Sequence, residues 1–149
     1  MTCTFDATVL IYTLVKPPDS KGERARELLA RCTRNGVALL LFQALAEFSH
    51  VAMRKFAIDP AEVCRRVNTW RRIIPVHVAG DDDLIGALEL VTDHKLGFWD
   101  ALMCATAARA GLRHMLTEDL QDGRRLGGLT IVNPFRTEDR RLIDRFLPP

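Results

Sequence analysis

Residues 97–123, GFWDALMCATAARAGLRHMLTEDLQDG, contain a complete helix-to-strand connection that ends in an acidic loop. Between the two glycines that bound the first half, small and apolar residues predict a short helix, because glycine commonly ends helices. The run RHMLT then predicts a buried strand, and Asp119 follows close behind it. The stretch therefore predicts one unit of an α/β protein, with a carboxylate at the carboxyl end of its strand.

The remainder of the chain continues this alternation of strands and helices. Short apolar runs predict further strands over residues 2–6, 37–42, 73–78 and 129–133. Helices are predicted over 20–35, 43–57, 81–95, from residue 60 onward, and within the basic segment 138–149. The segments 7–12, 16–20 and 118–128 are predicted as an apolar turn and two loops. We expect a three-layer α/β/α sandwich with a mostly parallel central sheet, which binds ligands beyond the carboxyl ends of its strands.

The composition is that of a globular chain. Of its 149 residues, 48% are hydrophobic and 27% are charged, a balance that excludes a disordered chain. The longest apolar run is too short to cross a bilayer, and the first residues lack the basic start of a signal peptide. We therefore expect one domain, residues 1–149, located in the cytoplasm and not in a membrane.

The four cysteines are spread along the chain without a C-x-x-C pair, and the histidines do not cluster. This spacing argues against a structural zinc site and against a disulfide framework. We expect four reduced thiols, most of them in the core. The net charge of +2 alone does not indicate a partner.

Most of the nineteen acidic residues have local explanations. Glu62, for example, has Arg65 and Arg66 at helical spacing, and such pairs stabilise exposed helices. Four acids lack such an explanation. Two stand at the ends of predicted strands, and two lie on predicted helices without Lys or Arg three or four residues away: Asp6, Asp119, Glu47 and Asp100.

The helix that carries Asp100 is otherwise apolar, so we expect a buried carboxylate that something outside the helix must satisfy. The alternative is a place in the first helical turn, where backbone N–H groups satisfy a carboxylate. If the four acids meet at one edge of the sheet, a cation must offset their repulsion. Mg²⁺ or Mn²⁺ prefers carboxylate ligands and supports hydrolysis of phosphodiesters.

Basic residues could form a rim around this acidic centre. Arg124 and Arg125 follow Asp119 in a loop bounded by glycines, and we expect them to contact the phosphates of the substrate there. Further arginines cluster in the sequence at 71–72 and in the C-terminal segment: Arg136, Arg140, Arg141 and Arg145. The alternative is that these residues are ordinary surface charge.

Five segments together resemble the successive motifs of PIN-domain ribonucleases of the VapC toxin type: FDATVLIYTL, ALAEFSHV, GFWDALMCATAARAG, HMLTEDLQDG and GLTIVNPF. The resemblance spans nearly the whole chain and implies a PIN-like fold, Mg²⁺- or Mn²⁺-dependent cleavage of RNA, often tRNA, and a homodimer. It also implies a cognate VapB-type antitoxin. We expect an antitoxin helix to bind in a groove formed by the exposed face of the LLFQALAEF helix together with the Trp70 region, and the alternative is that Trp70 and the phenylalanines are core residues. The family's acidic quartet falls on Asp6, Glu47, Asp100 and Asp119.

One motif departs from the family pattern. The family usually has Asp-Thr-Asn or Asp-Ser-Asn in the first motif, whereas this chain has Asp6-Ala7-Thr8. The hydroxyl is displaced by one position and the amide is lost, which affects the groups that orient Asp6. In the later acidic loop, Asp122 is a candidate outer ligand, with a turn-forming Asp before glycine as the alternative.

Two rival functions follow from these residues. A HAD-type phosphatase also has an aspartate at the end of its first strand, but it needs a second aspartate two residues later, where this chain has Thr8. We therefore exclude it. A catalytically weakened PIN fold that binds RNA or protein remains the alternative to a ribonuclease, and the first-motif departure is its support.

Overall fold

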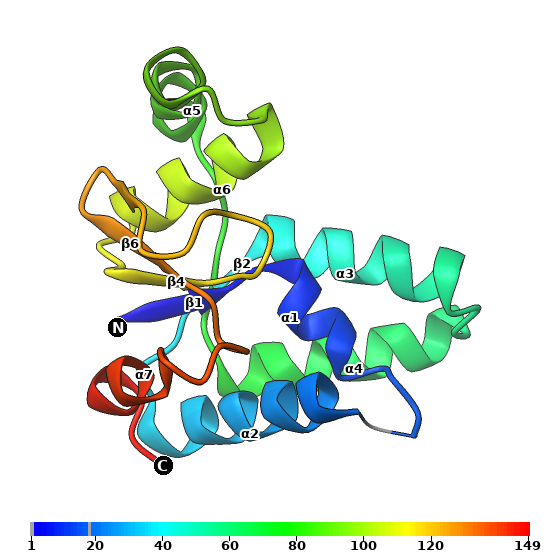
Figure 1. The fold of residues 1–149 in the computed structure, drawn as a ribbon. Helices are drawn as coiled ribbons and strands as arrows, with labels where there is room; N and C mark the ends of the chain where they lie inside the picture. The colour runs from blue at the N-terminus through cyan, green and yellow to red at the C-terminus, as the bar shows by residue number, and fades with distance from the viewer. Residues whose placement is uncertain (1, 18) are drawn as a thin grey trace.

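The computed structural model describes residues 2–17 and 19–149 (Figure 1). The predicted loop over 16–20 includes Pro18, which lies outside the described residues, as does Met1. The strands are β1 (Cys3–Phe5), β2 (Leu40–Leu41), β3 (Val76–His77), β4 (His114–Leu116), β5 (Arg125–Leu126) and β6 (Leu129–Val132). The helices are α1 (Ala7–Tyr12), α2 (Ser20–Asn35), α3 (Phe42–Lys55), α4 (Pro60–Ile73), α5 (Asp81–His94), α6 (Phe98–Arg109) and α7 (Arg140–Phe146).

The strands form one four-stranded sheet in the order β1-β4-β6-β5 and a two-stranded sheet of β2 and β3. A parallel bridge between Cys3 and Ala38 connects the two sheets. All strand pairs within the sheets are parallel except β5 with β6. The carboxyl ends of β1, β2, β4 and β6 therefore lie at the same edge.

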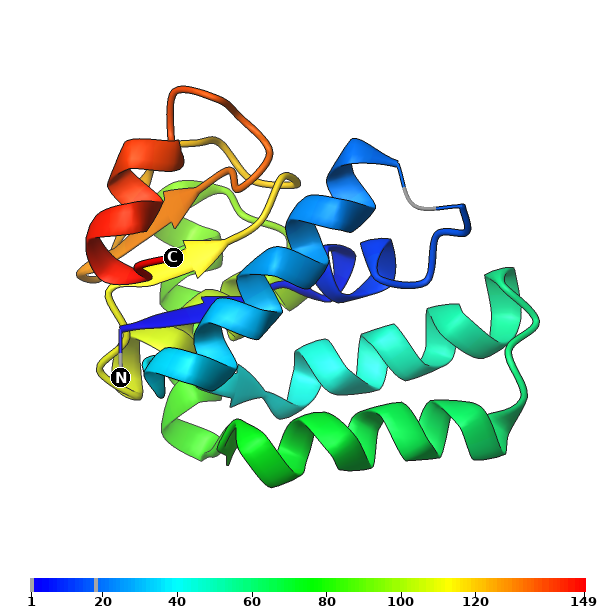
Figure 2. The same ribbon diagram turned by 90° about the horizontal axis from the view of Figure 1, so that it is seen from below.

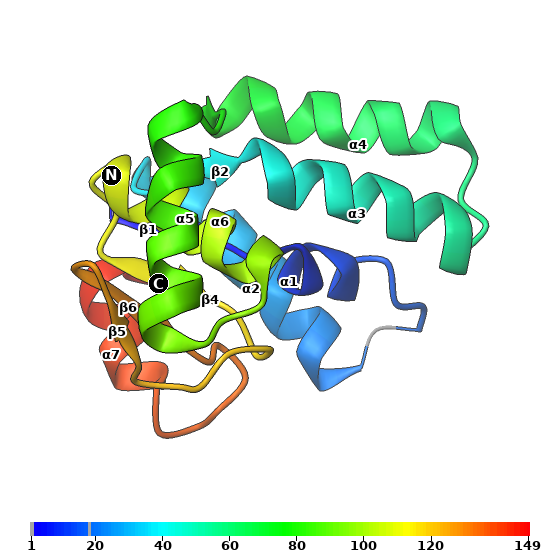
Figure 3. The same ribbon diagram turned by 90° about the horizontal axis from the view of Figure 1, so that it is seen from above.

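Helices cover the sheet on both sides (Figures 1 and 2). Helices α5 and α6 pack together on one face, and α2 and α7 lie on the other. Figure 3 shows α3 and α4 running side by side away from the sheet. The predicted three-layer α/β/α arrangement with a mostly parallel sheet is confirmed.

The sheet lies between apolar layers, which explains why its strands are continuous apolar runs rather than alternating ones. Phe5, Met115, Leu116 and Ile131 are all fully buried. Three of the cysteines are buried and free, as expected, whereas Cys64 is exposed. None of the helices in the described residues is long and apolar enough to span a membrane.

Three local predictions were wrong. Residues 7–12 form helix α1 rather than a turn, because Ala7, Val9 and Leu10 can all be buried on one side of a helical turn. The predicted strand at 73–78 is reduced to β3, since α4 continues through Ile73 and Pro75 has no N–H to donate.

The predicted loop at 118–128 contains β5, the third difference. Gly127 and Gly128 have φ angles of 55° and 90° and connect Leu126 to its partner Leu129. Two consecutive residues with positive φ form the tight turn that joins antiparallel strands, and glycine adopts it without strain. This hairpin places Arg125 on a strand instead of in a mobile loop.

Candidate active site

Asp6 lies at the carboxyl end of β1 and precedes α1. Only 8% of the residue is exposed, and its Oδ2 accepts a hydrogen bond from Thr117 Oγ1 at 2.8 Å. Burial raises the pKa of the carboxyl to about 7; the Thr117 hydrogen bond opposes the shift, and the neighbouring Asp119 adds to it. Asp6 is thus a carboxylate whose negative charge is poorly compensated by the protein.

Asp119 comes from the loop after β4 and lies beside Asp6. Its backbone N–H donates to Thr117 Oγ1 at 3.1 Å, so one threonine contacts both acids. Thr8 Oγ1, from the first turn of α1, donates to Asp119 Oδ2. The two hydrogen bonds cross. Thr117, two residues before Asp119, donates to Asp6, and Thr8, two residues after Asp6, donates to Asp119.

Asp100 lies in the first turn of α6, on the exposed side of the helix. The expectation of a buried carboxylate was therefore wrong. Asp100 does lie in the first helical turn, as in the alternative, but none of the hydrogen bonds of the described residues joins its carboxylate to a backbone N–H. A negative charge is favourable there because of the helix dipole. Partial burial, followed by the charge of Asp119, raises the pKa of Asp100.

Cys104 lies one turn further along α6, and its pKa responds to the charges around it. Its thiol pKa is raised to about 12, first by burial and then by the charges of Asp100 and Asp6, while Arg124 opposes the shift. The charges of Asp6 and Asp100 thus both act on Cys104, and Asp119 acts in turn on each of these two acids. The thiol itself remains protonated and is no candidate for a metal ligand.

Glu47 approaches from α3. Gln43 Nε2 donates to Glu47 Oε1 at 2.7 Å and to the backbone oxygen of Trp99 at 2.9 Å, which connects α3 to the start of α6 beside Asp100. Glu47 also lines a cavity of about 410 Å³ together with Ala7 and Thr8. Glu47 thus lies close to α1, which carries Thr8, and to α6, which carries Asp100. It contacts none of the three other acids directly.

The four acids do not form a closed ligand set in this structure. Within residues 2–17 and 19–149, no three His, Cys, Asp or Glu side chains are close enough to hold a metal ion. The donors are nevertheless all carboxylates, and the pKa values of Asp6 and Asp100 are raised first by burial and then by the charge of Asp119. A bound cation would offset both effects. The chemistry of the set suits a hard divalent ion.

Asp122 is occupied by structural contacts. Its Oδ1 accepts from Asn133 N at 2.8 Å, and its Oδ2 pairs with Arg136 at 3.3 Å. These contacts fix the acidic loop against the chain that leaves β6. They are long-range contacts rather than the local hydrogen bonds of a turn-forming Asp, and neither of them involves Asp6, Glu47, Asp100 or Asp119.

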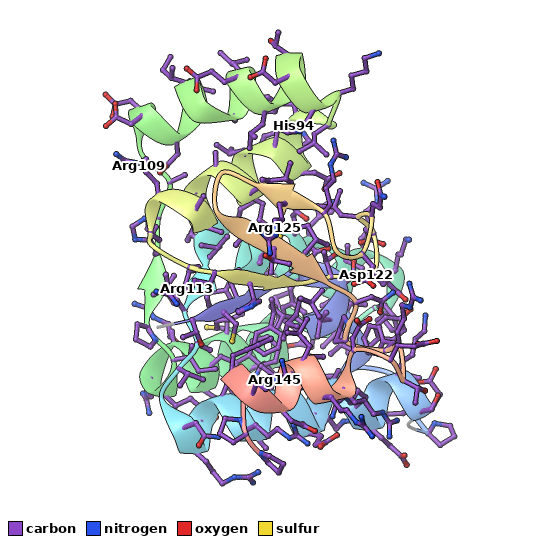
Figure 4. All side chains as sticks on the ribbon, turned by 60° about the vertical axis from the view of Figure 1, so that its left-hand side comes forward. His94, Arg109, Arg113, Asp122, Arg125 and Arg145 are labelled. Carbon is purple, nitrogen blue, oxygen red and sulfur yellow. The ribbon has the colours of Figure 1, made fainter. Side chains whose placement is uncertain are left out.

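Arg124 and Arg125 lie at different positions along the strand direction of the sheet. Arg124 Nη2 donates to the carbonyl oxygen of His94 at 2.5 Å, at the end of α5, and its charge reaches Cys104. Arg125 pairs with Thr130, which pairs with His114 at the start of β4. Figure 4 shows Arg125 on the β5–β6 hairpin and Asp122 in the loop. The register thus places Arg125 away from the edge that carries the acids.

The family model of the PIN domain matches residues 3–126, which include all four acids. The chain belongs to the PIN domain family. No match was found among curated protein sequences.

Solved structures similar to this chain include a toxin and toxin–antitoxin complexes. VapC20 of Mycobacterium tuberculosis, described as a toxin that cleaves the sarcin–ricin loop, has a TM-score of 0.65 and 17% identity, covering 79% of this chain and 92% of its own. VapBC2 of Rickettsia felis, bound to promoter DNA, has a TM-score of 0.67 and 16% identity, with 89% and 98% covered. DNA-bound VapBC of Salmonella typhimurium has a TM-score of 0.66 and 20% identity, with 90% and 98% covered. At these identities the likeness concerns the fold.

One group in this PIN domain escaped the sequence analysis. Glu118 accepts hydrogen bonds from the Tyr12 hydroxyl and, at 2.5 Å, from Lys21 Nζ, and the Lys21 ammonium also lies 5.3 Å from the ring centre of Phe135. These contacts join α1, α2 and the segment after β6 to the residue next to Asp119. No local pattern signals them, because the partners of Glu118 are about a hundred residues away in sequence.

Proposed function

We propose that the protein is a metal-dependent endoribonuclease that hydrolyses RNA phosphodiester bonds, and that it is the toxin of a VapBC-type toxin–antitoxin pair. The observation that carries this proposal is the pair of crossed hydrogen bonds that hold Asp6 and Asp119 side by side in a PIN fold. We take residues 1–149 as a single PIN domain that acts in the cytoplasm on RNA, tRNA included.

Asp6, Asp119, Asp100 and Glu47 are the residues that we propose to hold Mg²⁺, or Mn²⁺ in its place. When bound, the ion would lower the pKa of a water molecule and stabilise the leaving oxygen of the phosphodiester. The protein's own groups have supporting roles. Thr117 and Thr8 orient two of the carboxylates, and Gln43 orients Glu47, since groups behind metal ligands fix their direction.

Arginines are proposed to hold the RNA backbone. Arg124 is the better placed of the two arginines, because its charge acts on the Cys104 thiol, as do the charges of Asp6 and Asp100. Its planar group suits bidentate contact with phosphate oxygens. Arg125 is exposed and is retained as a more distant phosphate contact.

The proposed partners are a VapB-type antitoxin and a second copy of the chain. A groove of about 450 Å³ between α3 and α4 suits an apolar antitoxin helix; its lining includes Phe42, Leu45, Ala46 and Val67. Trp70 does not line this groove and instead packs edge-to-face on Phe48. For the homodimer, α5 offers exposed apolar side chains at Leu84, Ile85 and Leu88.

A catalytically weakened PIN fold that binds RNA or protein is the second candidate. Its support was the displaced hydroxyl of the first motif. Because the Thr8 hydroxyl contacts Asp119, this chain retains a threonine donor beside the acids, and the observation favours the nuclease.

The test is cleavage of total RNA by purified protein freed of any antitoxin. We expect products with Mg²⁺ or Mn²⁺, none with EDTA, and none from Asp100→Asn with either metal. Intact RNA in all conditions, with retained RNA binding, would favour the binding module. A small upstream reading frame for an antitoxin would distinguish a toxin from a housekeeping nuclease.

A further inference from the structure

Trp99 is the most exposed large apolar side chain in the described residues, with 65% of its surface accessible. It directly precedes Asp100 in the first turn of α6. The Phe98 ring packs against it edge-to-face, with ring centres 5.2 Å apart, which restricts the orientation of the indole. A tryptophan kept exposed and oriented beside a candidate active site indicates a surface that binds something.

The indole forms one wall of a cavity of about 480 Å³. The other wall is one face of α3, with residues at helical spacing: Gln43, Ala46, Glu47, His50 and Val51. Gln43 donates hydrogen bonds to Glu47, on its own helix, and to the Trp99 carbonyl, which connects the two sides of the cavity. The cavity is mostly apolar, with polar groups only along the α3 side.

We propose that this cavity binds one unpaired nucleobase of the RNA, stacked on Trp99, next to the scissile phosphate. The inference rests on the proposed ribonuclease function and adds a substrate subsite to it. Unpaired RNA bases are recognised by stacking on aromatic side chains and by hydrogen bonds to their edges. The Trp99 ring supplies the stacking surface, and His50 supplies a polar group at its border.

Charge on α3 favours an RNA over other occupants. Glu47, His50 and Arg54 share one face of the helix by their spacing, and Lys55 follows in the same exposed last turn. A nucleotide chain that leaves the cavity along α3 would therefore meet cationic side chains. A second protein copy seated here would instead bury Glu47, a carboxylate that the proposed reaction needs open.

The experiment measures RNA binding separately from cleavage. The chain has two tryptophans, and Trp70 is packed on Phe48. A short unpaired RNA oligonucleotide of mixed sequence is titrated in EDTA, with tryptophan fluorescence and anisotropy as readouts. We expect RNA to quench the fluorescence of the parent protein and of Trp70→Phe, but not that of Trp99→Phe.

Trp99→Ala should weaken binding about tenfold, while Trp99→Phe retains most of the affinity because a phenyl ring also stacks. Phe42→Ala is the matched control, since Phe42 is also an exposed aromatic (55%) but lines the neighbouring α3–α4 groove. It should bind RNA like the parent. An oligonucleotide with abasic positions should bind the parent more weakly and lose the quenching.

Parental affinity in Trp99→Ala, or fluorescence of Trp99 that RNA does not quench, would overturn the proposal. The same holds if light scattering shows that Trp99→Ala only dissociates a dimer, with RNA binding unchanged. The two proposals fail separately. RNA that quenches Trp99 but is never cut with Mg²⁺ or Mn²⁺ removes the nuclease, whereas cutting and binding at parental levels by Trp99→Ala removes the base pocket.

Discussion

The Thr8 hydroxyl donates a hydrogen bond to Asp119, a residue 111 positions away in the chain. In the family's usual first motif the hydroxyl follows the aspartate directly, but here Ala7 occupies that position and is buried against the core. The threonine one position later is only half-buried, and its side chain reaches the carboxylate that follows β4. In this chain the first-motif hydroxyl thus supports Asp119, while Asp6 receives its hydrogen bond from Thr117.

Replacing Thr8 tests this support. Thr8→Val keeps the shape of the side chain and removes the donor to Asp119, so we expect cleavage at limiting Mg²⁺ to fall about 10- to 100-fold, as for other groups behind metal ligands. Thr8→Ser restores the hydroxyl and should restore most of the activity. The measurement is the initial cleavage rate against Mg²⁺ concentration. A parental Mg²⁺ dependence in Thr8→Val would show that the hydrogen bond has no role in the site.

Asp100→Asn separates the metal site from the fold. The change keeps the size of the side chain and removes one negative charge close to Asp119, so cleavage should be abolished. Without metal, the melting temperature should equal or exceed that of the parent, because repulsion is relieved. Added Mn²⁺ should raise the melting temperature of the parent but have a smaller effect on the variant.

Asp122→Asn is the matched control for this charge removal. Because its two oxygens contact Asn133 and Arg136, we expect this variant to retain cleavage and to lose about 1 kcal/mol of unfolding free energy. Loss of cleavage with unchanged stability would return Asp122 to the role of an outer ligand.

Tyr12 offers a spectroscopic probe of the contacts around Glu118, because it is the only tyrosine in the chain. Its pKa is raised above the ordinary value near 10, first by burial and then by Glu118. The folded state thus favours the neutral phenol. The resulting stabilisation is complete below about pH 10 and is lost as the pH rises through the higher folded pKa.

Ultraviolet absorbance of the tyrosinate measures this titration directly. Glu118→Gln removes the negative charge, so its Tyr12 midpoint should lie below that of the parent. Tyr12→Phe should reduce the unfolding free energy by about 1 kcal/mol, the usual cost of one hydrogen bond. Equal midpoints in the parent and in Glu118→Gln would mean that the phenol does not contact Glu118 in solution.

The sheet and its acidic edge were within reach of sequence reasoning. Short continuous apolar runs identify strands buried on both faces, and parallel strands end at one edge. Asp6 and Asp119 each follow such a run, so their proximity is a consequence of topology. The missed hairpin also had a signal, since two glycines between Leu126 and Leu129 are typical of a two-residue turn.

The contacts that orient the acids could not be predicted from the sequence. Thr8 and Asp119, like Tyr12 and Glu118, meet only after the chain has crossed the sheet several times. Asp100 was expected to be buried because its neighbours in sequence are apolar. Its exposure depends on which side of α6 the sheet covers, and the nearly uniform apolar composition of this helix does not indicate that side.

The last prediction concerns how RNA is held. Each cationic side chain that neutralises a phosphate releases counterions, so affinity falls as salt rises. The charge of Arg124 acts on Cys104 together with those of Asp6 and Asp100, whereas Arg125 pairs with Thr130, away from the carboxyl ends of the strands. Arg124→Ala should therefore weaken binding to unpaired RNA and reduce the slope of log affinity against log salt by about 0.7, the contribution of one phosphate contact. Arg125→Ala removes the same charge from the adjacent residue and should change the slope less. Anisotropy titrations in EDTA at several salt concentrations give both slopes, and equal slopes for the two variants would mean that position relative to the acids does not matter.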